Sequence, residues 1–198
     1  MKRAPQRCDH TRRLLLRAAA LACAAAGAAL LTAAAPAAAQ GGAALERSVK
    51  AAFLYKFLGY TEFPAGAFGD AGAPVVIGVV GSDEMAAELL RIVAGRSIGS
   101  RPLLVRQLRD GDAAGAVHLL FVAGADSARA ARALHLAPGP VLLVTECGNG
   151  LQLGSIINFK IVEERVRFDV SLEAADKANI KLSSRLLTVA NHVSKGAP

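Results

Sequence analysis

Tryptophan is missing from this 198-residue sequence, tyrosine occurs twice, and aromatic residues make up only 5% of the chain. Cysteine is also scarce, with three residues in all. No His or Cys pair has the spacing of a zinc or copper site, and no serine has an obvious histidine partner. These absences exclude a disulfide-rich scaffold and leave no motif for a metalloenzyme or a serine hydrolase.

Residues 1–39 have the three parts of an export signal. Lys2 and five arginines stand at the start, an apolar run extends from Ala18 to about Leu31, and small residues close the segment at Ala37-Ala38-Ala39. The apolar run is too short and too rich in alanine for a permanent membrane span. We therefore predict cleavage near Ala39 and a mature protein that works outside the cytoplasm.

The export route stays open at this point. The stretch from Thr11 to Arg17 resembles a twin-arginine box, but plain Sec leaders also carry paired arginines, which favours Sec. Leu21-Ala22-Cys23 hints at a lipoprotein box, although Ala20 stands where a larger aliphatic residue is usual.

Removal of the leader changes the net charge and the number of cysteines of the mature protein. The leader contains six of the 23 basic and one of the 16 acidic residues, which leaves 17 against 15 and a net charge of about +2 instead of +7. The remaining chain has no basic run interleaved with aromatics, so nucleic-acid binding is not indicated. Cys147 alone remains and cannot form an internal disulfide. We expect it to be partly buried, with an intermolecular bridge or a redox-sensitive thiol as the alternative.

The segment after the leader reads as one domain, 40–193, with 194–198 as a disordered tail. A first helix is expected over 43–59, because apolar residues recur at three- and four-residue spacing. Its phenylalanines and tyrosines are expected in the core, with a partner-facing ridge as the alternative.

Short apolar strands then alternate with helices. Strands are expected over 74–81, 101–108, 117–122 and 141–145, and helices over 83–94 and 126–136. Ser82 can cap the first of these helices. His118 is expected to be a hydrogen-bonded structural residue. The alternation predicts an α/β three-layer sandwich with a mainly parallel sheet.

The C-terminal part predicts an antiparallel edge hairpin. Residues 155–162 and 165–170 flank the two-residue turn Glu163-Glu164, and charged and apolar residues alternate along the second strand. Helical segments are expected over 172–178 and 183–192. Alternating charge at a sheet edge either protects the edge or docks a partner.

Several segments along the chain together form a recognisable pattern. It opens with the stretch from Val49 to Phe57, closing on Thr61-Glu62-Phe63-Pro64, continues with 77–81 and 95–98, and closes with 156–159, 165–170 and 181–187. This pattern resembles the opening, middle and closing motifs of the YfiR family of periplasmic proteins. The matches run in order over nearly the whole chain after the leader.

The resemblance implies a non-enzymatic periplasmic regulator without cofactor or metal. The implied partner is the periplasmic sensor domain of an inner-membrane diguanylate cyclase, whose repression lowers cyclic di-GMP and restrains biofilm. It also implies a homodimer with no nucleic acid and no membrane insertion. By position in the closing motif, the implied partner-binding residues are Ile157, Phe159, Phe168 and Asp169. Redox control through an internal disulfide is not expected here, because Cys147 has no partner.

Two other functions remain open from the residues alone. One is a periplasmic small-ligand binding module that acts with a receptor or sensor kinase, since α/β strand ends form clefts for small ligands. The other is an enzyme whose active site is assembled from distant residues.

Overall fold

The computed structural model describes residues 36–70 and 72–195. By internal contacts the chain divides after Ala44, and the fold below is that of the unit that begins at Leu45. Helix α2 (Pro36–Gly59) starts before this boundary and continues into the unit. Most of the predicted export signal lies outside the described residues, so its cleavage stays a prediction.

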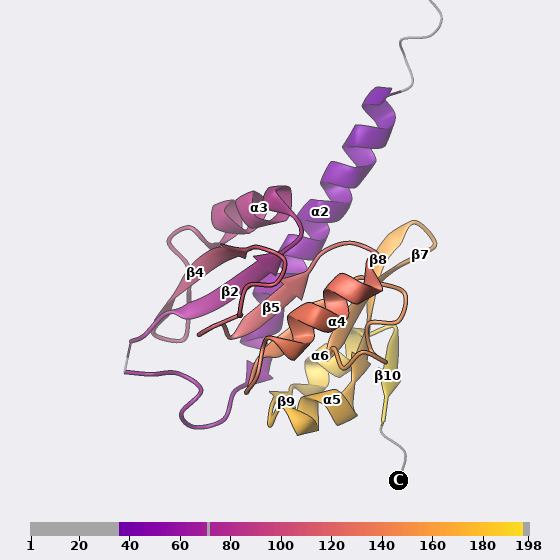
Figure 1. The fold of residues 1–198 in the computed structure, drawn as a ribbon. Coiled ribbons are helices and arrows are strands. Elements are labelled where there is room, and N and C mark those ends of the chain that lie inside the picture. The colour runs from indigo at the N-terminus through magenta and orange to yellow at the C-terminus, as the bar shows by residue number, and fades with distance from the viewer. Residues whose placement is uncertain (1–35, 71, 196–198) are drawn as a thin grey trace, which may run out of the picture. The chain divides into compact units, whose positions relative to one another are not determined.

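A mixed sheet organises the unit (Figure 1), in the strand order β10-β8-β7-β6-β5-β2-β4-β3. The strands are β2 (Val75–Val80), β3 (Ser97–Ile98), β4 (Arg101–Leu108), β5 (Leu119–Val122), β6 (Leu142–Thr145), β7 (Ile157–Val162), β8 (Arg165–Ser171) and β10 (His192–Ser194). A separate small sheet pairs β1 (Thr61–Glu62) with β9 (Lys181–Leu182).

Parallel pairing dominates the sheet, as predicted. The pairs β4–β2, β2–β5, β5–β6 and β6–β7 are all parallel. Antiparallel pairs stand towards the two ends, where β7 pairs with β8 and β3 with the start of β4. Strand β10 then pairs in parallel with the outer side of β8.

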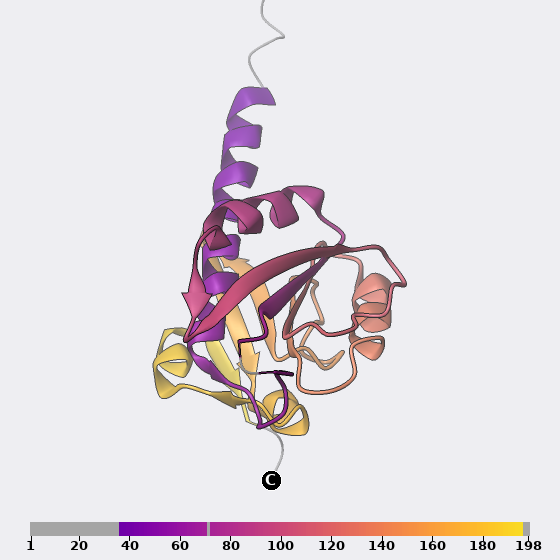
Figure 2. The same ribbon diagram turned by 90° about the vertical axis from the view of Figure 1, so that its left-hand side faces the viewer.

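Helices cover both faces of the sheet and make the three layers (Figures 1 and 2). On one face lie α2 and α3 (Asp83–Val93), together with residues of α5 (Leu172–Lys177) and α6 (Ser184–Val189) in the same apolar cluster. On the other face α4 (Ser127–His135) packs over a second cluster, which includes Cys147. The predicted α/β three-layer sandwich is confirmed.

Local sequence explains most of these elements. All six residues of β2 are buried, because helices cover both faces of the sheet there, and this explains the continuous apolar run in its sequence. Ser82 accepts a hydrogen bond from the Met85 N–H and caps α3, and Asp126 accepts from the Ala128 and Arg129 N–H groups and caps α4. Gly95 follows α3 with φ +67°, a conformation that costs glycine little.

The chain end differs from the sequence prediction. The helix expected over 183–192 ends at Val189, and residues 192–194 form β10 beside β8. The Asn191 N–H donates to the Phe168 carbonyl and the Asn191 amide donates to the Asp169 carboxylate. These tertiary bonds take the segment out of the helix and into the sheet.

Candidate partner-binding surface

The hairpin β7–β8 closes on a tight turn. Val162 faces Arg165 in the register, so Glu163 and Glu164 are the two central turn residues. Both have positive φ, +49° and +58°. Positive φ at both central residues is the mark of a type I′ turn, whose twist matches that of the flanking strands. The turn is therefore type I′, formed here without the usual Asn or Gly.

Phenylalanine rings anchor the base of the hairpin to α2. Phe159 and Phe168 face each other across the strands. The Phe57 ring stands 5.7 Å from the Phe159 centroid and 4.9 Å from that of Phe168, and Phe53 stands 5.5 Å from Phe168. These offset and edge-to-face arrangements are favourable beyond the burial of area. The expectation that the aromatics of the first helix serve the core is confirmed for Phe57, which is fully buried.

The four residues that the family resemblance pointed to lie inside the protein. Ile157, Phe159 and Phe168 belong to the apolar cluster under α2, and Asp169 is only 3% exposed. In this structure their side chains cannot be the exposed contacts of a partner. Whether the hairpin itself binds a partner stays a prediction.

Asp169 is the polar anchor of the hairpin. Its carboxylate accepts hydrogen bonds from Lys160 Nζ at 2.5 Å and from the Asn191 side-chain amide at 2.7 Å. Burial opposes ionisation, but these bonds and the Lys160 charge outweigh it and hold the pKa of Asp169 below its usual value. The ionised group therefore ties β7, β8 and the segment before β10 together.

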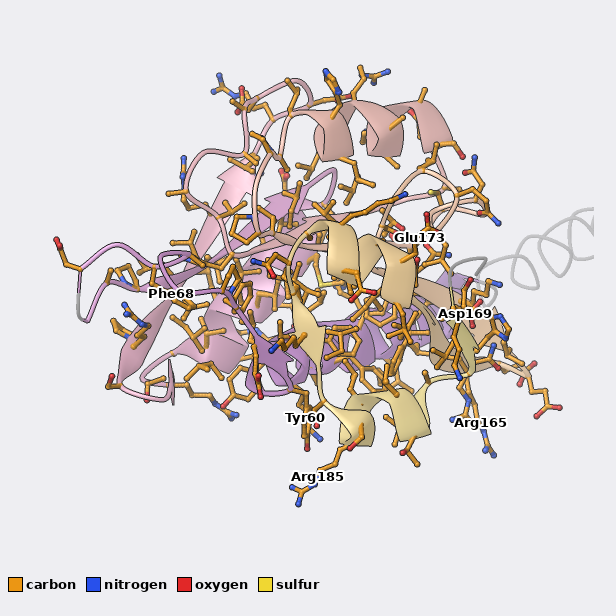
Figure 3. All side chains as sticks on the ribbon, turned by 90° about the horizontal axis from the view of Figure 1, so that it is seen from below. Tyr60, Phe68, Arg165, Asp169, Glu173 and Arg185 are labelled. Carbon is orange, nitrogen blue, oxygen red and sulfur yellow. The ribbon has the colours of Figure 1, made fainter. Side chains whose placement is uncertain are left out.

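The exposed side chains of the hairpin form what we call the hairpin surface. It consists of Lys160, Ile161, Glu163, Glu164, Arg165 and Arg167. Ile161 is the apolar member of the surface and is 51% exposed. Figure 3 shows Arg165 and Asp169 on the same strand, with Arg165 pointing away from the ribbon. By the strand register, Lys160, Arg165 and Arg167 share one face of the hairpin, and Ile161 lies on the opposite face with Phe159 and Phe168.

A second polar cluster lies where parallel strands β5 and β6 end. Lys50 of α2 donates to Glu146, at 2.5 Å, and to Glu46. Glu146 also accepts the Gly124 backbone N–H. Burial lowers the pKa of Lys50, but the two carboxylates outweigh it and raise the pKa above its ordinary value. The crevice where such folds bind small ligands is thus occupied here by the protein's own ion pairs.

The opposite ends of the strands hold an open cavity of about 270 Å³. Phe63, Phe68 and Arg101 line it, and the Arg101 guanidinium lies 4.5 Å from the Phe68 ring centroid. His118 stacks on Phe68 at 4.5 Å. Its Nδ1 accepts the Val76 N–H at 3.0 Å, so the proton sits on Nε2, which donates to the Ala67 carbonyl at 3.2 Å. The prediction that His118 is a hydrogen-bonded structural residue is confirmed.

Two further features bear on catalysis and membrane insertion. Gly95-Arg96-Ser97-Ile98-Gly99 has the G-x-S-x-G spacing, which sequence analysis overlooked, but it joins helix α3 to strand β3 and not a strand to a helix, so it forms no nucleophile elbow. Across 36–70 and 72–195, no helix has both the length and the apolar character needed to cross a bilayer.

Comparison with known proteins places this α/β sandwich in a family. The YfiR/HmsC-like family model matches residues 47–191, more than half of the chain, and the protein belongs to this family. The match includes α2 from residue 47 onward and the whole hairpin. A comparison with curated proteins gave no match.

Proposed function

We propose that the protein is an exported, non-enzymatic regulator in the periplasm. It binds the periplasmic sensor domain of an inner-membrane diguanylate cyclase and represses the enzyme, which lowers cyclic di-GMP and restrains biofilm formation. Membership of the YfiR/HmsC-like family over residues 47–191 carries this proposal.

The hairpin surface is the proposed contact with the sensor domain. Its base is fixed by the phenylalanine rings and by the Asp169 bonds, so little ordering of the backbone is needed on binding. Arg165 and Arg167 offer charges on one face of the hairpin, whose partners would fix the orientation of the complex, and Ile161 offers an exposed apolar side chain on the other face.

Binding of the purified sensor domain tests this contact. The paired change Arg165→Glu and Arg167→Glu is expected to weaken binding by at least about tenfold, because charge pairs across an interface are strongly coupled. Lys181→Glu with Arg185→Glu is the matched control, since it makes the same change in net charge on exposed residues of β9 and α6. Equal binding by the hairpin variant and the wild type would remove the hairpin surface from the proposal. If the wild type does not bind the sensor domain, the cyclase is not its partner.

The homodimer that the family implies belongs to the same proposal. Sedimentation of the purified protein at increasing concentration is expected to show a dimer. A monomer at all concentrations would contradict it and leave the binding of the sensor domain to be judged separately.

The cavity between Phe63, Phe68 and Arg101 favours a second candidate function. A cavity of about 270 Å³ with aromatic walls and one guanidinium suits a small apolar ligand with a negative group. In this second function the protein would bind the ligand and act with a receptor or sensor kinase. A screen of small metabolites by thermal unfolding tests it, because a ligand bound only by the folded state raises the melting temperature. The rise should disappear in Phe68→Ala. No rise with any metabolite would count against this candidate.

A further inference from the structure

The outer edge of β4 is an open sheet edge. Strand β3 pairs only with its first two residues, Arg101 and Pro102. From Leu103 to Leu108 one side of β4 pairs with β2, and no other strand within 36–70 and 72–195 pairs with the far side. Alternate residues there direct backbone N–H and C=O groups outward. Six residues of open edge extend over about 20 Å.

An apolar groove runs beside this edge. It measures about 600 Å³ and is lined by the last turn of α3, the loop to β3 and the first half of β4. Leu90 on α3 is 54% exposed and Leu104 on β4 is 50% exposed. Side chains of a strand laid along β4 would alternate between the two faces of the sheet, so every second one would enter this groove.

Arginines are frequent in the chain that forms the groove and its edge, and Arg96 lines the groove. Residues 89–109 contain five arginines and no acidic residue: Arg91, Arg96, Arg101, Arg106 and Arg109. Arg91 pairs with Glu88, and Arg101 donates to the Asp70 and Ala73 carbonyls. Arg96 and Arg106 are exposed. The Arg96 guanidinium lies over the Tyr55 ring, 5.1 Å from its centroid.

We propose that the edge of β4 binds an extended, acidic segment of a partner protein by strand addition. Outward backbone groups of β4 would pair with the segment, its apolar side chains would enter the groove, and the carboxylates that alternate with them would lie on the other face of the sheet, where Arg106 points. A second copy of this chain is a poor occupant. Antiparallel pairing of two β4 edges would bring the same arginines together, and like charges across strands are destabilising.

This surface is separate from the hairpin surface, because β4 and β8 stand towards opposite ends of the strand order. The inference therefore does not rest on the proposed contact with a cyclase. It would give the regulator a second docking site, so that one partner could be held while another is engaged.

Hydrogen exchange with a defined probe tests the proposal. A short synthetic peptide of alternating glutamate and valine is added to the purified protein at low salt. Exchange of amides within 103–108 is expected to slow, while exchange in the hairpin stays unchanged. The same peptide with lysine in place of glutamate should give no protection, and high salt should weaken the effect.

Variants at exposed positions sharpen the test. Arg106→Glu is expected to lower the affinity for the glutamate peptide about two- to fivefold, the range of an exposed charge pair. Leu104→Asp should lower it at least as much. Arg185→Glu and Leu45→Asp are matched controls at exposed residues elsewhere and should bind as the wild type does. Unchanged melting temperatures will show that all four variants fold.

Three results would overturn the proposal. The first is no protection of β4 amides by the glutamate peptide, which would leave the arginines as edge protection only. The second is equal binding of the lysine peptide. The third is a dimer of the wild type that Leu104→Asp abolishes, which would assign the edge to a second copy.

Discussion

At the residue scale, burial separates the side chains that hold the hairpin from those that can contact a partner. Side chains of a strand alternate between the two faces of the sheet. Phe159 and Phe168 face α2, and Arg165 and Arg167 are exposed on the same hairpin. The apolar residues of the closing motif therefore serve the core, and binding of a partner by the hairpin itself stays a prediction.

Phe168→Ala is expected to lower the free energy of unfolding by about 3–5 kcal/mol, because the ring is buried and a cavity would remain. Urea unfolding measures the change. Arg165→Ala, at an exposed site, is the control and should stay within about 0.5 kcal/mol of the wild type. If Phe168→Ala is as stable as the wild type but binds the partner less tightly, Phe168 contacts the partner and is not a core residue.

His118 gives the structure a pH dependence. Burial, helped by the Arg101 charge, lowers the pKa of His118 below its ordinary value, and the bond to the Ala67 carbonyl only partly opposes this. The folded state thus binds the proton less readily than the unfolded state. The contribution of neutral His118 to stability is fully present above its pKa in the unfolded state, about 6.5. It is lost as the pH falls from there through the pKa of His118 in the folded state.

We expect the free energy of unfolding to be lower at about pH 5.5 than at about pH 7.5. His118→Gln keeps a polar side chain without titrating in this range, so its difference between the two pH values should be smaller. It should also be less stable at the higher pH, because the Val76 N–H loses its acceptor. An equal pH dependence in both proteins would show that His118 is not its source.

At the scale of elements, the hairpin turn carries local strain. Glu163 and Glu164 adopt left-handed backbone conformations, which cost a residue with a Cβ about 1–2 kcal/mol relative to glycine. The double change Glu163→Asn with Glu164→Gly supplies the residues that type I′ turns prefer. It is expected to raise the free energy of unfolding by about 1 kcal/mol in urea unfolding.

The same variant also tests whether Glu163 and Glu164 contact the partner. If they do, the stabilised variant should bind the partner less tightly than the wild type. A variant that is less stable than the wild type would contradict the type I′ assignment.

Sequence patterns predicted the elements whose burial is regular. The run over 74–81 predicted β2 because both faces of that strand are covered, and 101–108 matched β4 residue for residue. Ser82 was predicted to cap α3 because the N-cap bond involves only neighbouring residues. Where the chain's local chemistry decides the structure, the sequence was sufficient.

Other features depend on residues far apart in the chain. β10 forms because Asn191 and His192 lie beside Phe168 and Asp169, and no local pattern indicates that pairing. The strands β1 and β9 have two residues each, too few for any periodicity. The aromatic cavity and the open edge of β4 likewise arise from packing, which is why sequence analysis predicted the hairpin and neither of these.

At the scale of the whole molecule, the central claim is that this protein acts by contact with another macromolecule after export. Expressed in a bacterium with two membranes, the protein is expected in the periplasmic fraction with its amino terminus near Gln40, because residues 1–39 have the pattern of an export signal. Amino-terminal sequencing of the fractionated protein measures this. A cytosolic protein that begins at Met1 would contradict it.

Cyclic di-GMP in cells tests the central claim most directly. Cells that carry the diguanylate cyclase are compared with and without this protein, and with the variant Arg165→Glu/Arg167→Glu at equal abundance. We expect the wild type to lower cyclic di-GMP and the hairpin variant to leave it unchanged. The same cyclic di-GMP level in all three strains would contradict it.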